Sequence, residues 1–186
     1  NLVDMLERYL CRERVEAEEE AKELIVEKSL VDRDRGLPQY IWLVVKDAKA
    51  KGISRITVEF VEKLPKDIVC YAETIIADAI CDSEWNDKIT TLAILMLMAE
   101  APNHSIDERT IRRLYELSIG KGESQAFKRI MRYLERYKGK IKIPHDSWLN
   151  ALYEPIILVH EIRAAKEKYK EPVSYTHLTL PTTERV

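Results

Sequence analysis

The residues best suited to chemistry are a histidine behind a short alternating segment and a corner of glycine and proline. His145 and Asp146 follow residues 140–143, whose alternation of lysine and isoleucine is typical of a strand. A histidine at this place can donate a hydrogen bond to a phosphate oxygen, and Asp146 can cap a following helix. Gly36 permits a backbone path that other residues resist, and Pro38 fixes the start of the next helix. Both spots are therefore candidate ligand contacts.

A run of basic side chains forms a second candidate site. Between Glu123 and Lys142 there are seven Lys or Arg against two Glu. If residues 124–137 form a helix, it would enter the major groove of DNA, and the strand behind it would touch the DNA backbone. Packing between domains is the other role open to that helix. The candidate DNA contacts are Lys128, Arg129, Arg132, Arg136, Lys140 and Lys142, of which Arg129, Arg132 and Arg136 would share one helical face.

Most of the elements that must position these residues have apolar residues at helical spacing. Hydrophobic residues make up 46% of the 186 residues and only 5 are glycine, which favours helices over a sheet-rich fold. Pro38 suits a first helical turn, Thr57 is a cap residue, and Ser105 with Glu108 has capping-box spacing. We expect helices over residues 2–10, 15–30, 38–51, 57–64, 67–80, 87–99, 105–119, 124–137 and 146–170.

Two stretches resemble STAND-class ATPases, which are relatives of the AAA+ and origin-recognition ATPases. Residues 29–38, which end in Gly-Leu-Pro, are similar to the Gly-x-Pro motif of the helical lid in that family, and residues 64–68, Leu-Pro-Lys-Asp-Ile, fit the start of a later lid helix. Residues 143–152, Ile-Pro-His-Asp-Ser-Trp-Leu-Asn-Ala-Leu, resemble the His-Asp motif at the end of the family's winged-helix domain. The order of elements agrees over roughly residues 1–160.

The resemblance implies a mainly α fold with a helical lid bundle and a winged-helix domain. The lid would cover residues 1–82, the winged helix with its short β wing residues 83–145, and a long C-terminal helix residues 146–172. In that family the Gly-x-Pro corner, here Gly36 and Pro38, packs against adenine. The histidine, here His145, contacts the β-phosphate of ADP and holds the winged helix in the closed state, so its loss releases the switch.

The same resemblance implies that the nucleotide is held only in part by this chain. No GxxxxGK[ST] phosphate loop and no strand with a metal-binding acidic pair occurs in the sequence. We expect those parts, with the Mg²⁺ that accompanies ATP or ADP, to precede Asn1 in a longer protein. This chain alone should then bind no cofactor or metal and have no catalytic residue. The implied partner is the upstream nucleotide-binding domain, with homo-oligomers in the ATP-bound state as a further option.

Other functions stay open at this point. A DNA-binding regulator is the main alternative, with double-stranded DNA as partner, and a helical interaction module without a ligand is the third. The sequence lacks a Ser/His/Asp set, paired carboxylates near an apolar pocket, and clustered cysteines, which argues against hydrolytic or redox catalysis.

Composition and the end of the chain complete the expectations. The three cysteines are widely spaced, which indicates reduced, buried or half-buried thiols in a cytoplasmic protein. The longest apolar run, residues 92–99, is far below the ~20 residues that cross a bilayer, so no membrane partner is expected. A net charge of -2 favours no class of partner. Residues 173–183 resemble a translated sequencing adapter, and residues 173–186 are left out of the predictions.

Overall fold

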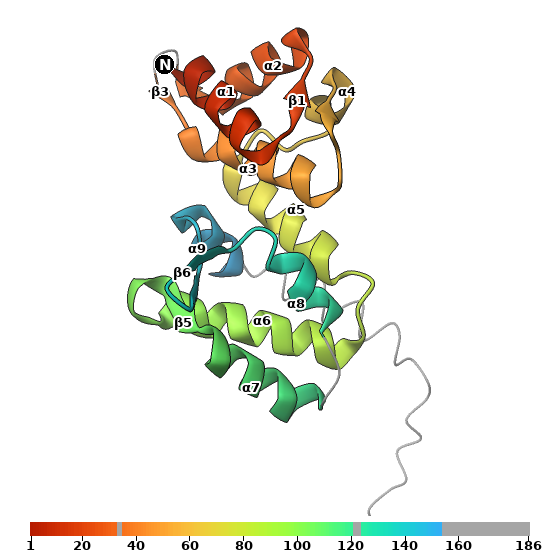
Figure 1. Ribbon diagram of the computed structural model, residues 1–186, viewed down its shortest axis with the longest axis vertical. Helices are drawn as coiled ribbons and strands as arrows, with labels where there is room; N and C mark the ends of the chain where they lie inside the picture. Colours follow the sequence, from red (N-terminus) through yellow and green to blue (C-terminus); the bar gives the residue numbers. More distant parts are fainter. Residues whose placement is uncertain (33–34, 121–123, 154–186) are drawn as a thin grey trace, which may run out of the picture.

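The chain forms two lobes that share one helix. The computed structural model describes residues 1–32, 35–120 and 124–153, and the described part is mainly helical with small sheets. Helix α5 (Ile68–Ile80) runs from the N-terminal lobe, residues 2–62, into the C-terminal lobe, residues 85–153 (Figure 1). The N-terminal lobe contains α1 (Leu2–Glu13), α2 (Glu19–Ser29), α3 (Pro38–Ala50) and α4 (Val58–Glu62). The C-terminal lobe contains α6 (Trp85–Glu100), α7 (Glu108–Ile119), α8 (Gln125–Ile130) and α9 (Asp146–Tyr153).

Short strands tie these helices together. In the N-terminal lobe β1 (Glu16–Ala17) pairs in parallel with β4 (Arg55–Ile56), and β2 (Leu30–Asp32) pairs with β3 (Arg35–Gly36) as an antiparallel hairpin. In the C-terminal lobe β5 (Ser105–Asp107), β6 (Glu135–Tyr137) and β7 (Lys140–Lys142) form an antiparallel sheet in the order β5-β7-β6. A 3-10 turn (Pro102–His104) precedes β5.

Local sequence signals account for the helix starts around α5. Pro38 is the first residue of α3, where its missing N–H costs nothing. The Thr57 side chain accepts a hydrogen bond from the Phe60 N–H at the start of α4. The Asp67 carboxylate accepts from the N–H groups of Val69 and Cys70, at 2.9 Å each, at the start of α5. The predictions for these three helices are confirmed.

Residues 124–137 are not one helix, so that prediction is wrong. Helix α8 ends at Ile130, and residues 135–137 form β6. The left-handed backbone of Lys138 (φ 50) and Gly139 (φ 75) closes a tight turn that pairs β6 with β7. Arg136 therefore lies on a strand and does not share a helical face with Arg129 and Arg132.

The predicted helix start at Ser105 is also wrong. Residues 105–107 pair with β7 as a strand, and α7 begins at Glu108. The Ser105 hydroxyl donates to the Pro102 carbonyl instead of capping a helix. Backbone pairing with β7 therefore outweighs the local capping signal. Of the predicted long C-terminal helix, only α9 is described; its continuation and the adapter-like residues lie outside the described residues.

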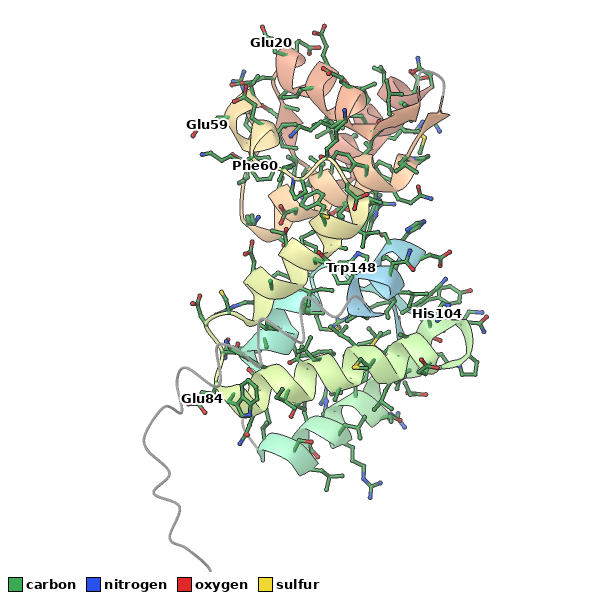
Figure 2. The ribbon with its side chains drawn as sticks, turned by 180° about the vertical axis from the view of Figure 1, so that it is seen from behind. Glu20, Glu59, Phe60, Glu84, His104 and Trp148 are labelled. Atoms are coloured by element: carbon green, nitrogen blue, oxygen red, sulfur yellow. The ribbon has the colours of Figure 1, made fainter. Side chains whose placement is uncertain are left out.

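One hydrophobic core extends through both lobes. It includes Leu6 and Tyr40 in the N-terminal lobe, Tyr71 in α5, and Ile141 and Trp148 in the C-terminal lobe. Trp148 is 0% exposed and lies at the junction of the lobes (Figure 2). The cysteines Cys11, Cys70 and Cys81 are free and exposed, contrary to the prediction of buried or half-buried thiols. Cys11 lies on α1, Cys70 lies on α5 and Cys81 directly follows α5, and the core covers none of these three side chains.

Buried tyrosines should make the fold sensitive to alkaline pH. The Tyr40 hydroxyl donates to the Pro65 carbonyl at 2.8 Å, and burial raises the pKa of Tyr40 from 10.0 to about 12. Burial also raises the pKa values of Tyr71, Tyr115 and Tyr133. Because the folded state holds these protons more tightly than the unfolded state, their contribution is complete below about pH 10 and is lost as pH rises toward 12 and beyond.

We expect Tyr40→Phe to reduce this alkaline loss of stability by about 1–2 kcal/mol, because the variant has no hydroxyl proton whose pKa differs between the folded and unfolded states. Denaturant unfolding curves between about pH 8 and pH 12 measure the slope of stability against pH. Tyr137→Phe is the control, because Tyr137 is 68% exposed. Equal slopes for wild type and Tyr40→Phe would contradict the prediction.

Candidate nucleotide cleft

Pro38 and His145 line the same cleft, although they come from different lobes. The cleft has a volume of about 270 Å³ and lies where the start of α3 faces the loop between β7 and α9. Helices α1 and α3 form one wall, and β6 with the β7–α9 loop forms the other. The residues that line it are Tyr9, Pro38, Gln39, Trp42, Glu135, Pro144 and His145.

The first wall is set by the β2–β3 hairpin that leads into α3. The Leu37 N–H donates to the Ser29 carbonyl at 2.8 Å, which fixes the chain one residue before Pro38. Gly36 lies in β3, opposite Leu30. Pro38 and Trp42 are four residues apart in α3, so both project from one helical face. This wall offers flat apolar surfaces, and they suit a planar aromatic ligand.

The second wall presents His145 in a defined tautomer. The Ser147 N–H donates to Nδ1 of His145 at 3.1 Å, and the Ser147 hydroxyl lies at the same distance from Nδ1. Because a backbone N–H can only donate, Nδ1 acts as the acceptor and the ring proton is on Nε2. The backbone N–H of Trp148 donates to the His145 carbonyl at 3.0 Å, so His145 precedes the first turn of α9. The cleft is thus offered one N–H donor beside the positive end of a helix.

The size and the polar side chains of the cleft suit part of a ligand. Its volume of about 270 Å³ is slightly smaller than the volumes of typical ligand pockets, ~300–1,000 Å³. Gln39 can both donate and accept, which suits the edge of a heterocyclic base. Glu135 lies on the same wall as His145 and adds a negative charge there, so a phosphate group would be stabilised only close to His145 and away from Glu135.

Two candidate DNA contacts, one on α8 and one just after it, are engaged inside the molecule. Arg129 donates to the Ala79 carbonyl at 3.2 Å, and Arg132 donates to the Ala50 carbonyl at 2.8 Å. Ala50 ends α3, and Ala79 is in the last turn of α5, where carbonyls lack helical partners. Positive charge is favourable at such helix ends. These two arginines therefore cap helices of neighbouring elements.

The remaining candidates lie on a surface of mixed charge. Lys128, Lys140 and Lys142 are exposed, and Arg136 lies 3.7 Å from Glu108. Three arginines on α7, which were not predicted, line a hollow next to them, together with a lysine of the β6–β7 turn that belongs to the predicted basic run. The acidic side chains Asp107, Glu108 and Glu116 share this hollow. These basic residues are Arg109, Arg112, Arg113 and Lys138. The close spacing of the arginines in residues 109–113 is the sequence feature that could have predicted this basic surface.

Sequence reasoning missed two buried carboxylates that join neighbouring elements of the fold. Asp47 is 0% exposed and accepts hydrogen bonds from Tyr71 at 2.9 Å, Tyr133 at 2.8 Å and Lys51 at 2.9 Å. Asp87, at 9% exposure, accepts from the Ser124 hydroxyl and from the first backbone N–H groups of α8. Asp47 lies inside the apolar stripe of a predicted helix, and this is the sequence feature that could have indicated a buried carboxylate.

Comparisons with known proteins leave the family open. No protein-family model matches the chain, and no curated protein or solved structure is detectably similar to it. The STAND resemblance therefore stays a prediction from the sequence motifs. Within residues 1–32, 35–120 and 124–153, no helix is long and apolar enough to cross a membrane, and no group of His, Cys, Asp or Glu is placed to hold a metal ion.

Proposed function

We propose that this chain is the nucleotide-sensing lid and winged-helix part of a STAND-type ATPase switch. The observation that carries the proposal is the shared cleft: Pro38 and His145, which the sequence motifs select independently, line one cavity from two lobes. The C-terminal lobe supports it, because α6, α7 and α8 with a sheet in the order β5-β7-β6 are the elements that we would expect of a winged helix.

The adenine ring is the part of the ligand that fits the apolar wall. Stacking of a base on an aromatic side chain such as Trp42 contributes about 1–3 kcal/mol. The Nε2–H of His145 would donate to a phosphate oxygen, and a hydrogen bond to a charged group contributes about 1.5–3 kcal/mol. A ligand held by both lobes stabilises the arrangement in which the walls face each other, which is the physical basis of a switch.

The rest of the nucleotide would be held by another domain. The chain contains no phosphate loop, so the phosphates of ATP or ADP and their Mg²⁺ are assigned to an upstream nucleotide-binding domain. In this proposal the present chain senses the nucleotide and the upstream domain hydrolyses it. Assembly of the ATP-bound protein into homo-oligomers belongs to the same proposal.

Duplex DNA binding is the alternative function. Lys140 and Lys142 are exposed on β7 and support it, since a wing often contacts the DNA backbone. The engagement of Arg129 and Arg132 with helix ends weakens it, because those side chains would have to leave their carbonyls to reach a phosphate. The cleft is therefore the better supported site.

Tryptophan fluorescence tests the proposed cleft. The cleft changes the expectation that this chain alone binds no cofactor. Because only part of the ligand is held, we expect ADP to bind weakly, with a dissociation constant on the order of 1 mM, and to change the emission of Trp42. Trp42→Phe should remove the emission change, and His145→Ala should weaken binding about tenfold through loss of one charged hydrogen bond.

Matched controls come from residues of the same types whose side chains do not line the cleft. The His104 ring contacts the Ala99 carbonyl, although the His104 backbone carbonyl accepts from the Ile143 N–H near the β7–α9 loop. Trp85 begins α6 beside Glu84, on the opposite side of the C-terminal lobe from His104 (Figure 2). His104→Ala and Trp85→Phe should leave ADP binding and the emission change of Trp42 intact. The proposal fails if ADP produces no saturable change, or if His104→Ala weakens binding as much as His145→Ala.

A further inference from the structure

The end of α3 is joined to the C-terminal lobe by polar contacts that the nucleotide cleft does not use. The Tyr133 hydroxyl donates to Oδ1 of Asp47 at 2.8 Å in a buried position. Next to it, Arg132 donates to the Ala50 carbonyl at 2.8 Å. One turn earlier, in α8, Arg129 reaches the Ala79 carbonyl of α5. We call Arg129, Arg132 and Tyr133 the latch.

Among the described residues, Arg132 is the one partner of the carbonyl that it reaches. The carbonyls of Asp47, Ala48 and Lys49 accept from the N–H groups of Lys51, Ile53 and Gly52. Ala50 is the remaining carbonyl in the last turn of α3, and it accepts from Arg132. The C-terminal lobe thus supplies the last cap of a helix in the N-terminal lobe, at its negative end.

The buried aspartate is arranged so that the latch can open without leaving a charge unpaired. Asp47 also accepts from Tyr71 in α5 and from Lys51 at the end of α3. These two partners stay with α3 and α5 if Tyr133 moves away. The open arrangement therefore avoids the large penalty of an isolated buried carboxylate, which permits two stable arrangements of the lobes.

The latch and the cleft are mechanically linked at both ends. Helix α3 carries Pro38 and Trp42 near its start and Asp47 and Ala50 near its end. In the C-terminal lobe, Tyr133 is followed two residues later by Glu135, which lines the cleft. A displacement of this segment from α3 changes the separation of the two cleft walls.

We propose that the latch is the closing device of the switch: its contacts with α3 and α5 keep the cleft walls together, and its release opens the cleft and speeds nucleotide loss. The part about nucleotide loss rests on the proposed function of the cleft. The part about lobe opening rests only on the contacts of Arg129, Arg132 and Tyr133.

Spin labels on the two lobes test the opening directly. With Cys70→Ser and Cys81→Ser, the exposed Cys11 on α1 takes one label, and Tyr137→Cys in the C-terminal lobe takes the other. Double electron–electron resonance then gives the distance distribution between α1 and β6. We expect one narrow distribution for this reference protein and an added, longer population when Tyr133→Phe and Arg132→Ala are combined.

The control variant carries the same types of substitution inside the C-terminal lobe. Tyr115→Phe removes a hydroxyl that is bonded to Thr91, and Arg109→Ala removes an exposed arginine of α7. This pair should leave the distances unchanged. If the double latch variant fails to fold, Arg132→Ala alone serves, because Arg132 is exposed. Unchanged distances in the folded latch variant would overturn the latch.

ADP release from the labelled proteins separates the two parts of the proposal. We expect release to become about tenfold faster in the latch variant, which corresponds to 1.4 kcal/mol. Longer distances with unchanged ADP release would overturn the link between latch and cleft. Longer distances in a protein whose reference form binds no ADP would remove the proposed function of the cleft and retain the opening device.

Discussion

Replacing Asp47 with alanine is expected to lower the free energy of unfolding by about 4 kcal/mol. The carboxylate is 0% exposed and accepts hydrogen bonds from Tyr71, Tyr133 and Lys51. Without it, two buried tyrosine hydroxyls lose their acceptor and the lobes lose a shared polar contact. Urea unfolding followed by tryptophan fluorescence measures the change at neutral pH.

Graded variants separate the carboxylate from its partners. Asp47→Asn keeps the shape and one acceptor, so we expect a smaller loss, about 2 kcal/mol. Lys51→Met should cost less than about 1 kcal/mol, because the Lys51 side chain is 40% exposed. A double-mutant cycle of Asp47→Asn with Tyr133→Phe isolates the contact between lobes. A loss below about 1 kcal/mol in Asp47→Ala would refute this account.

Replacing Asp87 with alanine is expected to cost about 3 kcal/mol. Its Oδ2 accepts from the N–H groups of Gln125 and Ala126 at 3.0 Å each, and its Oδ1 accepts from the Ser124 hydroxyl. This carboxylate on α6 thus satisfies the otherwise unpaired donors at the start of α8 and faces the positive end of that helix. Its loss should destabilise the C-terminal lobe and raise hydrogen exchange in α8.

Asp67 provides the comparison for this prediction. It caps α5 in the same chemical manner, through the N–H groups of Val69 and Cys70, but it is exposed. Asp67→Ala should therefore cost only about 1 kcal/mol. The account of Asp87 is wrong if the two substitutions cost the same in denaturant unfolding.

Local chemistry predicted α3, α4 and α5, and long-range contacts decided the elements that were missed. The helix predicted over residues 15–30 begins only at Glu19, because residues 16–17 pair with β4. Pro38, Thr57 and Gly52 act within one turn of their own positions, so the bounds of α3 and α4 were readable from sequence. The residues after Ile130 also fit a helical pattern. They leave the helix because Tyr133 reaches Asp47, and because the turn at Lys138 and Gly139 pairs β6 with β7.

The candidate site was predictable only in part for the same reason. Pro38 and His145 were selected by short motifs, and the fold brings them to one cleft. Tyr9, Trp42 and Glu135 complete that cleft from α1, α3 and β6, and no spacing in the sequence relates these positions. The buried partners of Asp47 likewise come from separate elements, so its role depends on the tertiary structure.

Helix α5 limits how this molecule can be dissected. It contacts α8 and α9 in one lobe, and its Tyr71 packs against Tyr40 in the other, with ring centroids 5.7 Å apart. If the chain were divided after Ile80, the C-terminal half would lose α5, against which α9 and its fully buried Trp148 pack. A cut before Ile68 would instead deprive α3 of the hydroxyl of Tyr71. The smallest autonomous piece of either half must therefore carry α5 with it.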